Sequence, residues 1–483
     1  MLNLAYAIVL ILFAGAAVAG LSARAAAKWF AQLFALAAFA ATVALAYVFA
    51  AAGKLALTVD LVSIGKVAVL GIVIDKISVL IALAVVGVGL LICIYSAVYL
   101  SEDNREHPDP GRRSYFAWLL AFIGSMAGLV FASTLVGQLL FFEMTGVCSW
   151  ALIAYYQDAA STRAAAKALL LTHVGSLGLY VAAAALFAAT GTFALSAIGS
   201  LGTATKTIVL MAILFAAWGK SAQLPLQMWL PDAMVAPTPI SAYLHAAAMV
   251  KVGVYIFARG LLAAGSVPES VGWVGAVMAV VTMIYGFVMY LPQKDLKRLL
   301  AYSTITQLSY VFLGLSLSVF GSRLAFDGAI AHIFNHAFAK SLFFLVAGAL
   351  AYTTGTRMLP KLRGILTRSP LLGISFCVAA LAVAGVPPFN GFFSKFAIFS
   401  GGFAAAQNHV LLLPLVIIAM FESVGSFAWF LHWVGSAVLG KPSPEVADAA
   451  PVPASIRAVL VVLVLMTLCS GEIGASWLGW NSP

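Results

Sequence analysis

The residues with the clearest potential for chemistry are ionisable side chains inside long apolar segments. Glu143 lies in the stretch LLFFEMTGVCSW, and Lys220 ends an apolar run shortly before Pro225. A charge in the middle of a membrane-length helix costs about 2.5–3.5 kcal/mol on insertion scales, so it usually faces a partner or a hydrated cavity. We therefore expect Glu143 and Lys220 to pair in a buried site that handles a proton or an ion. The alternatives are a static ion pair, or a Lys220 that reaches the membrane interface beside a loop.

A second set of titratable residues recurs at helical spacing. His332, His336 and Lys340 are separated by four residues each, so they share one face of a helix with modest drift. Histidine changes its charge near neutral pH, and a file of such groups predicts stepwise proton transfer. The alternative is a set of core histidines with satisfied hydrogen bonds. Two histidines at this spacing are weak evidence for a metal site, and we predict none.

Further ionisable residues extend this set along the chain. His245 and Lys251 lie six residues apart, about 240° around a helix, which predicts different neighbours for them: Lys220 on one side and the helix of His332 on the other. A lysine desolvated between charged neighbours can exchange protons near neutral pH. The spacing predicts a relay that runs in the plane of the membrane. The relay also takes in three later or flanking candidates, which are Lys395, Glu422 and Asp232.

Prolines and glycines interrupt the apolar segments at two places. GKSAQLP contains Pro225, and AGVPPFNGFFSKF (384–396) contains Pro387 and Pro388. Proline removes a helical hydrogen bond, and broken backbone survives at membrane depth only where protein or water satisfies it. Corresponding breaks in two halves of a chain point to inverted repeats with the site at their interface.

Composition sets the class of protein. The chain has 483 residues, of which 63% are hydrophobic and 9% charged, against the ~25% charged residues of soluble domains. Apolar runs recur from end to end, so we predict an all-α polytopic membrane protein with about 14 helices at about 20 residues per span. The expected helices are 2–22, 28–52, 77–100, 115–134, 136–156, 167–190, 206–228, 239–263, 271–291, 299–320, 325–353, 370–399, 410–437 and 456–478.

These segments divide into four parts. Residues 1–114 hold the first three helices, and Val62 to Ile74 between them is expected to form a β-hairpin outside the bilayer. Two five-helix repeats, each with a broken helix, follow at 115–263 (helices 4–8) and 264–440 (helices 9–13). Residues 441–483 hold the last helix.

The basic residues indicate the orientation. The side that is poor in them has chiefly Lys54, Lys66 and Arg323. The other side should face the cytoplasm of a bacterial inner membrane, with both termini in the periplasm. We expect no cleaved signal peptide, because the first basic residues follow the first apolar run. The basic loops contain Arg24, Lys28, Arg105, Arg112, Arg113, Arg163, Lys167, Lys294, Lys297, Arg298, Arg357, Lys361, Arg363, Arg368, Lys441 and Arg457.

The stretch KSAQLPLQMWLPDAMVAPTPISAYLHAA (220–247) carries a family resemblance. It is similar to the antiporter-like subunits shared by respiratory complex I, the multi-subunit cation/proton antiporters and the energy-converting hydrogenases. Within that family, NREHP, FAAWGKSAQLP, MVKVGVYIFAR, GSRLAFDGAIAHIFNHAFAKSLFFLVAGAL and KPSPEVADAAP most resemble component D of the hydrogenase-4 (formate hydrogenlyase) membrane arm.

The resemblance implies 14 helices in two inverted five-helix repeats. It implies a Glu143–Lys220 pair, a link between the halves at His245 or Lys251, a central group at His332, His336 and Lys340, and a terminal lysine at Lys395. One departure stands out: many relatives have Arg-Val-Gly-Asp where this chain has His173-Val174-Gly175-Ser176, so any gating pair that uses the acid is in doubt.

The expected function follows from that resemblance. It is a proton-translocating subunit, with sodium as the alternative ion, in a hydrogenase-4 type complex whose [NiFe] centre and iron–sulfur clusters lie in partner subunits. The partners would be other antiporter-like and membrane-arm subunits and a hydrogenase peripheral arm. The chain shows no nucleophile–base constellation, so we expect no catalysis, cofactor or nucleic-acid binding of its own. The alternatives are a complex I or cation/proton antiporter subunit, a non-conducting structural subunit, and an independent transporter of an organic solute.

Overall fold

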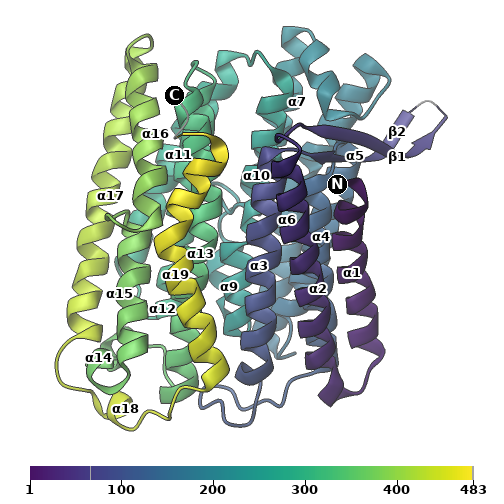
Figure 1. The fold of residues 1–483 in the computed structure, drawn as a ribbon. Coiled ribbons are helices and arrows are strands. Elements are labelled where there is room, and N and C mark those ends of the chain that lie inside the picture. The colour runs from purple at the N-terminus through teal and green to yellow at the C-terminus, as the bar shows by residue number, and fades with distance from the viewer. Residues whose placement is uncertain (66, 481–483) are drawn as a thin grey trace.

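Long helices stand side by side in the computed structural model, which describes residues 1–65 and 67–480 (Figure 1). Within these residues, 12 helices are long and apolar enough to cross a membrane, so the prediction of a multi-pass helical membrane protein is confirmed. The two other predicted spans are the ones we expected to be broken. The full count of about 14 spans and the inverted repeats stay predictions.

The N-terminal part contains three long helices and a hairpin. They are α1 (Leu2–Leu21), α2 (Arg24–Ala51), β1 (Leu57–Ile64), β2 (Val67–Ile74) and α3 (Lys76–Tyr99). The two strands pair antiparallel, which confirms the hairpin, although its first strand begins earlier than predicted, at Leu57. Lys66 lies outside the described residues. The Asp75 carboxylate caps α3 by accepting hydrogen bonds from the N–H groups of Ile77 and Ser78.

The next elements lead to the first break. They are α4 (Arg113–Phe131), α5 (Leu135–Ile153), α6 (Ala159–Thr190), the short helix η1 (Leu195–Ser200) and α7 (Thr203–Lys220). The sixth predicted helix begins earlier than residue 167, because the Asp158 carboxylate accepts a 2.6 Å hydrogen bond from Ser161 N and caps α6 at Ala159. Helices α6 and α7 pack closely: a Cβ added at Gly175 would lie 2.8 Å from Gly219 Cα.

The segment after Lys220 is broken twice. It consists of α8 (Trp229–Asp232), η2 (Ala233–Val235), α9 (Thr238–Ala246) and α10 (Met249–Ala264). The break after Lys220 was predicted. The break between α9 and α10 was not, because no proline or glycine marks it. His245 and Lys251 therefore lie on different helices, and their predicted separation around one helix does not apply.

The second half is built around two buried helices, α12 (Leu296–Ser318) and α13 (Arg323–Thr354). Helix α13 packs against α3, α9, α10 and α12 and against three later helices. The break predicted around Pro387 and Pro388 separates α15 from α16. The remaining elements are α11 (Glu269–Tyr290), η3 (Leu359–Lys361), α14 (Ile365–Arg368), α15 (Pro370–Ala384), α16 (Asn390–Ala406), η4 (Val410–Leu412), α17 (Leu413–Trp433), η5 (Val434–Val438), α18 (Pro444–Ala447) and α19 (Ala454–Leu478).

Both chain ends lie toward the end of the molecule that carries the hairpin (Figure 1). The short elements α14 and α18, which belong to the basic loops, lie at the opposite end. This arrangement agrees with the prediction that the two termini share one side. Which compartment each side faces stays a prediction.

Candidate functional site

The centre of the molecule contains a contact between two titratable groups on α10 and α13. Lys251 Nζ lies 2.9 Å from His336 Nδ1, and both side chains are buried. The contact brings together two residues that the sequence placed 85 positions apart. It meets the expectation that Lys251 faces the helix of His332 and His336.

Helix α13 presents its titratable residues along one face, as its spacing predicted. The rings of His332 and His336 are 5.9 Å apart. Lys340 Nζ donates hydrogen bonds to Ser303 Oγ (2.8 Å) and to Leu300 O (3.1 Å), both on α12. The Nε2 atoms of His332 and His336 have no hydrogen-bond partner within the described part of the chain. Buried polar atoms in this position are typical sites for bound water.

His245 on α9 is fully buried, and neither of its ring nitrogens has a hydrogen-bond partner among the described residues. Its ring lies 4.7 Å from that of Phe344 on α13. The structure therefore turns His245 toward α13, and no hydrogen bond joins it to Lys220, the neighbour expected from the sequence.

Lys220 lies at the end of α7 and faces α5. Its Nζ donates a 3.3 Å hydrogen bond to Thr145 Oγ1 and lies 4.6 Å from the centre of the Phe142 ring. Gly146 leaves room for this amine, because a Cβ added there would lie 3.0 Å from Lys220 Nζ. The lysine is thus held by a hydroxyl and an aromatic face.

The expected direct pair between Lys220 and Glu143 is not formed among the described residues. The Glu143 carboxylate instead lies 3.2 Å from His173 Nδ1 on α6. The side chains of His173 and Glu143 are 53% and 27% exposed, so this contact lies at the outer face of the bundle. The physical reason is helical phase: α5 turns Phe142, Thr145 and Gly146 toward Lys220, and Glu143 between them points toward α6.

Ser176, which replaces the expected acid of the family pattern, takes part in this outer contact. Its hydroxyl donates a 2.8 Å hydrogen bond to His173 O and lies 3.4 Å from His173 Nδ1. No second carboxylate is present in this cluster, so Glu143 is the only acid that contacts His173 among the described residues.

Lys395 lies on α16 just after the second break. Its Nζ donates 3.2 Å hydrogen bonds to Ala384 O, at the end of α15, and to Ser423 Oγ on α17. It also lies 4.3 Å from the centre of the Tyr310 ring. The break thus supplies a carbonyl that helps to hold the lysine, in the manner expected of broken membrane helices.

Glu422, named from the sequence as a further candidate, lies within this second cluster. Its carboxylate accepts hydrogen bonds from the hydroxyls of Tyr290, Tyr310 and Ser426. Tyr310 therefore touches Glu422 through its hydroxyl and Lys395 through its ring. Sequence reasoning missed the two tyrosines, although both lie in apolar helices that contain buried polar residues.

Asp232 does not join the buried groups. Its Oδ2 atom accepts a 2.7 Å hydrogen bond from Lys167 Nζ, and both side chains are partly exposed. The two breaks are satisfied by protein: Trp229 Nε1 donates to Gly219 O at the first, and Asn335 Nδ2 donates to Asn390 O at the second.

The buried groups thus form three clusters. The first contains Lys220 and Thr145, the second contains Lys251 with the α13 residues, and the third contains Lys395 with Glu422. The first two are connected through Ser221, whose hydroxyl donates a 2.8 Å hydrogen bond to Val250 O. The second and third are connected by His332 Nδ1, which lies 2.9 Å from Ser394 Oγ.

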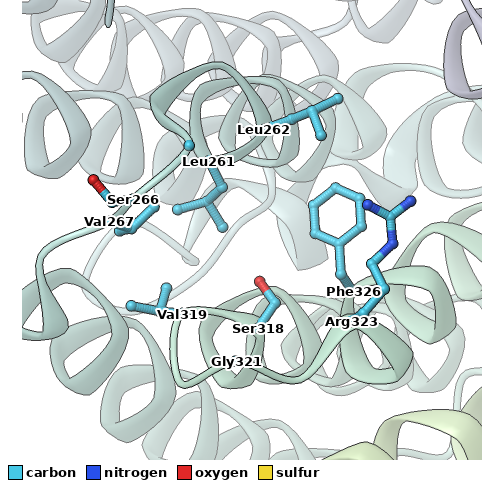
Figure 2. Close-up of a pocket in the computed structure, with 10 residues that line it drawn as sticks. Leu261, Leu262, Ser266, Val267, Ser318, Val319, Gly321, Arg323 and Phe326 are labelled. Carbon is cyan, nitrogen blue, oxygen red and sulfur yellow. The ribbon is translucent and has the colours of Figure 1, made fainter. Parts of the chain in front are cut away.

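A cavity of about 490 Å³ lies apart from these clusters. It is located between the loop after α10 and the turn between α12 and α13, with Leu261, Val267, Val319 and Phe326 on its walls (Figure 2). Its charged residue, Arg323, forms an ion pair with Asp327 at 3.0 Å. Within the described residues, no group of three or more His, Cys, Asp or Glu side chains is placed to hold a metal ion.

Comparisons with known proteins relate this arrangement to a family. A family model described as "NADH:quinone oxidoreductase/Mrp antiporter, TM" matches residues 132–421, and one described as "NADH-Ubiquinone oxidoreductase (complex I), chain 5 N-terminus" matches residues 62–116. The A/B subunit of a probable K(+)/H(+) antiporter from Rhizobium meliloti is 35% identical over 469 residues, which cover 94% of this chain and 45% of the relative. The largest match in Alkalihalophilus pseudofirmus, a Na(+)/H(+) antiporter subunit, is 34% identical over 418 residues, which cover 82% and 51%. The chain thus spans about half the length of these relatives.

Two solved structures have a similar fold. A chain of the Mrp complex from Dietzia sp. DQ12-45-1b matches with a TM-score of 0.85 and 30% identity, over 99% of this chain and 52% of that one. A chain of the membrane-bound sulfane sulfur reductase, an archaeal respiratory membrane complex, matches with a TM-score of 0.83 and 24% identity, over 98% and 95%. The second likeness concerns the fold alone.

Proposed function

The chain belongs to the NADH:quinone oxidoreductase/Mrp antiporter membrane-subunit family, and from that premise we propose that it is an ion-translocating subunit of a multi-subunit cation/proton antiporter. The observation that carries the proposal is the series of buried lysines, Lys220, Lys251 and Lys395, each held by neutral hydrogen-bonding groups or an aromatic ring. A stability role alone does not account for them, because burying an ammonium costs more than such contacts return.

The antiporter assignment was an alternative at the sequence level, and the relatives favour it. The two relatives described above are subunits of a K(+)/H(+) and a Na(+)/H(+) antiporter. The hydrogenase-4 assignment, with metal centres in a peripheral arm, has support only from motifs such as NREHP (104–108). It is therefore the second candidate, and co-purification of this chain with or without a [NiFe] hydrogenase distinguishes the two.

In the proposed mechanism, protons move between the three clusters along the membrane plane. Lys251 and His336 exchange a proton directly, and His332 passes it toward Ser394 and the cluster of Lys395. Water fills the remaining gaps, next to the unpartnered ring nitrogens. Like charges repel strongly in this weakly polar interior, so charging one lysine disfavours charging the next, which couples the clusters. The distribution of basic loops supports a bacterial inner membrane location with both termini in the periplasm.

Ion flux in sealed vesicles that contain the whole complex tests the proposal. A pH-sensitive dye and probes for Na⁺ and K⁺ report transport by the wild type, Lys220→Ala and the matched control Lys294→Ala, which removes an exposed loop lysine. Loss of cation-dependent proton movement in Lys220→Ala alone, with unchanged subunit content, supports an ion-translocating subunit. Unchanged flux in Lys220→Ala, or loss of the whole complex from the membrane, supports the structural alternative.

A further inference from the structure

A cavity of about 370 Å³ opens between the start of α6, the α8–η2 segment, the start of α12 and the loop after α13. Four cationic side chains line it, with one acid. The five charged residues are Arg163, Lys167, Asp232, Arg298 and Arg357. These elements belong to the end of the molecule where the basic loops lie.

Two of these cations have a carboxylate partner and two do not. Lys167 pairs with Asp232 at 2.7 Å, and Arg357 pairs with Asp295 at 2.6 Å outside the cavity lining. Arg163 and Arg298 form no ion pair within the described residues, and Arg163 Nε donates a hydrogen bond to a carbonyl of its own helix. The cavity therefore has an excess of positive charge whose guanidinium groups lack an acidic partner. Arginine recognises phosphate well, because its planar fork donates two parallel hydrogen bonds.

An apolar groove runs along the same helix, deeper in the bundle. It has a volume of about 640 Å³, lies between α5 and α6, and is lined by Val147, Trp150, Leu169 and Leu170 among others. Leu170 is 63% exposed. Arg163 and Leu170 are seven residues apart, which is about two turns, so they lie on one face of α6 about 10 Å apart along its axis. Basic cavity and apolar groove thus follow each other in the order of the head and tail of a phospholipid.

We propose that α6 binds an anionic phospholipid, with the phosphate between Arg163 and Arg298 and an acyl chain in the groove past Leu170. Trp150 is 40% exposed near the end of α5 at this side, a position typical of aromatic residues at the lipid headgroup level. Basic pockets between membrane helices attract the anionic lipids of the cytoplasmic leaflet. A free phosphate ion would use the cavity but leave the groove empty. The site does not depend on the ion-transport proposal.

Native mass spectrometry of the purified complex tests this site. The complex is titrated with phosphatidylglycerol, phosphatidylcholine, sn-glycerol 3-phosphate or inorganic phosphate. This chain is present as the wild type, as Arg163→Gln/Arg298→Gln, or as the control Arg457→Gln, an exposed arginine outside the cavity. Each lost arginine should weaken phosphatidylglycerol binding about fivefold, so the double variant should lose about 25-fold. The control variant should bind as the wild type does, and phosphatidylcholine should bind weakly to all three proteins.

Two further variants separate binding from general damage. Asp232→Asn removes the acid that competes for Lys167 and should strengthen phosphatidylglycerol binding, which a misfolded chain would not do. Leu170→Ser should weaken it without changing the total charge.

Three outcomes overturn the proposal. Equal binding of phosphatidylcholine removes the role of the anionic head, and equal competition by glycerol 3-phosphate or inorganic phosphate removes the role of the groove. Unchanged lipid binding in the double variant, with or without dissociation of a partner protein, shows that the two arginines serve another contact.

Discussion

Lys251 on α10 and His336 on α13 share one short contact, 2.9 Å between Nζ and Nδ1, in the middle of the molecule. An ammonium donates this hydrogen bond only if Nδ1 has a free lone pair, so His336 is then neutral with its proton on Nε2. A charged His336 would in turn require a neutral Lys251, because two adjacent cations repel strongly in a weakly polar interior. The pair therefore holds one excess proton, which either residue can carry.

The first prediction concerns this pair. Lys251→Met keeps the length and apolar stem of the side chain but removes the titratable group, so proton transfer between the clusters should stop. Flux in vesicles should fall to background while the complex still assembles. The control is Lys361→Met, at an exposed loop position. Wild-type flux in Lys251→Met would mean that protons bypass this pair.

The second prediction concerns the space around Lys220. A Cβ in Gly146→Ala would lie 3.0 Å from Lys220 Nζ, and the flexible end of the lysine can move away. The variant should fold normally, but the amine should leave Thr145, and transport should fall. Val147→Ala, at an exposed position of the same helix, is the control. A large loss of thermal stability together with the loss of transport would contradict this interpretation.

The third prediction separates the two contacts of Tyr310. Tyr310→Phe retains the ring beside Lys395 but removes one hydroxyl donor to Glu422, and a hydrogen bond to a charged group contributes about 1.5–3 kcal/mol. Tyr310→Leu removes both contacts. Transport should decrease in the order wild type, Tyr310→Phe, Tyr310→Leu. Tyr302→Phe, on the same helix, should behave as the wild type, and equal transport in all four proteins would exclude Tyr310 from the pathway.

The fourth prediction concerns stability at the hairpin end of the molecule. Asp75 and Arg259 form an ion pair that is largely buried. Burial alone would raise the pKa of the Asp75 carboxyl, but Arg259 and the donors at the start of α3 outweigh it and hold that pKa below its ordinary 3.8. Because the folded pKa is lowered, the stabilisation is fully present above about pH 4 and is lost as the pH falls through the folded value.

Asp75→Asn keeps a good helix cap but leaves Arg259 buried without a counter-ion, which costs about 3–5 kcal/mol. The melting temperature in detergent should therefore be lower than that of the wild type by a constant amount from about pH 5 to 8. The difference should narrow below about pH 4, where wild-type Asp75 becomes protonated. A difference that grows on acidification would have the wrong sign for this pair.

Several features of the site were predictable because their signals are local. The prolines of GKSAQLP and AGVPPFNGFFSKF marked two real breaks, since proline disrupts a helix wherever it lies. The four-residue spacing of His332, His336 and Lys340 placed them on one face, since α13 is continuous through all three. The break between α9 and α10 has no such local signal and was missed.

The partners of these residues were harder to predict. Glu143 was expected to pair with Lys220 and contacts His173 instead, because a change of about 100° per residue decides which neighbour a side chain on α5 reaches. The hydroxyls around Glu422 come from α11, α12 and α17, which no spacing within one helix can bring together.

The sequence by itself determined that this chain is a bundle of apolar membrane helices with rare buried charges. That conclusion needs only the transfer cost of each side chain, which does not depend on neighbours distant in sequence. Only the tertiary structure decided which charge meets which partner: Lys220 with Thr145, Lys251 with His336, and Lys395 with Tyr310. Hydrogen bonds and ion pairs depend on distances of a few ångströms and on direction, and the packing of separate helices sets both.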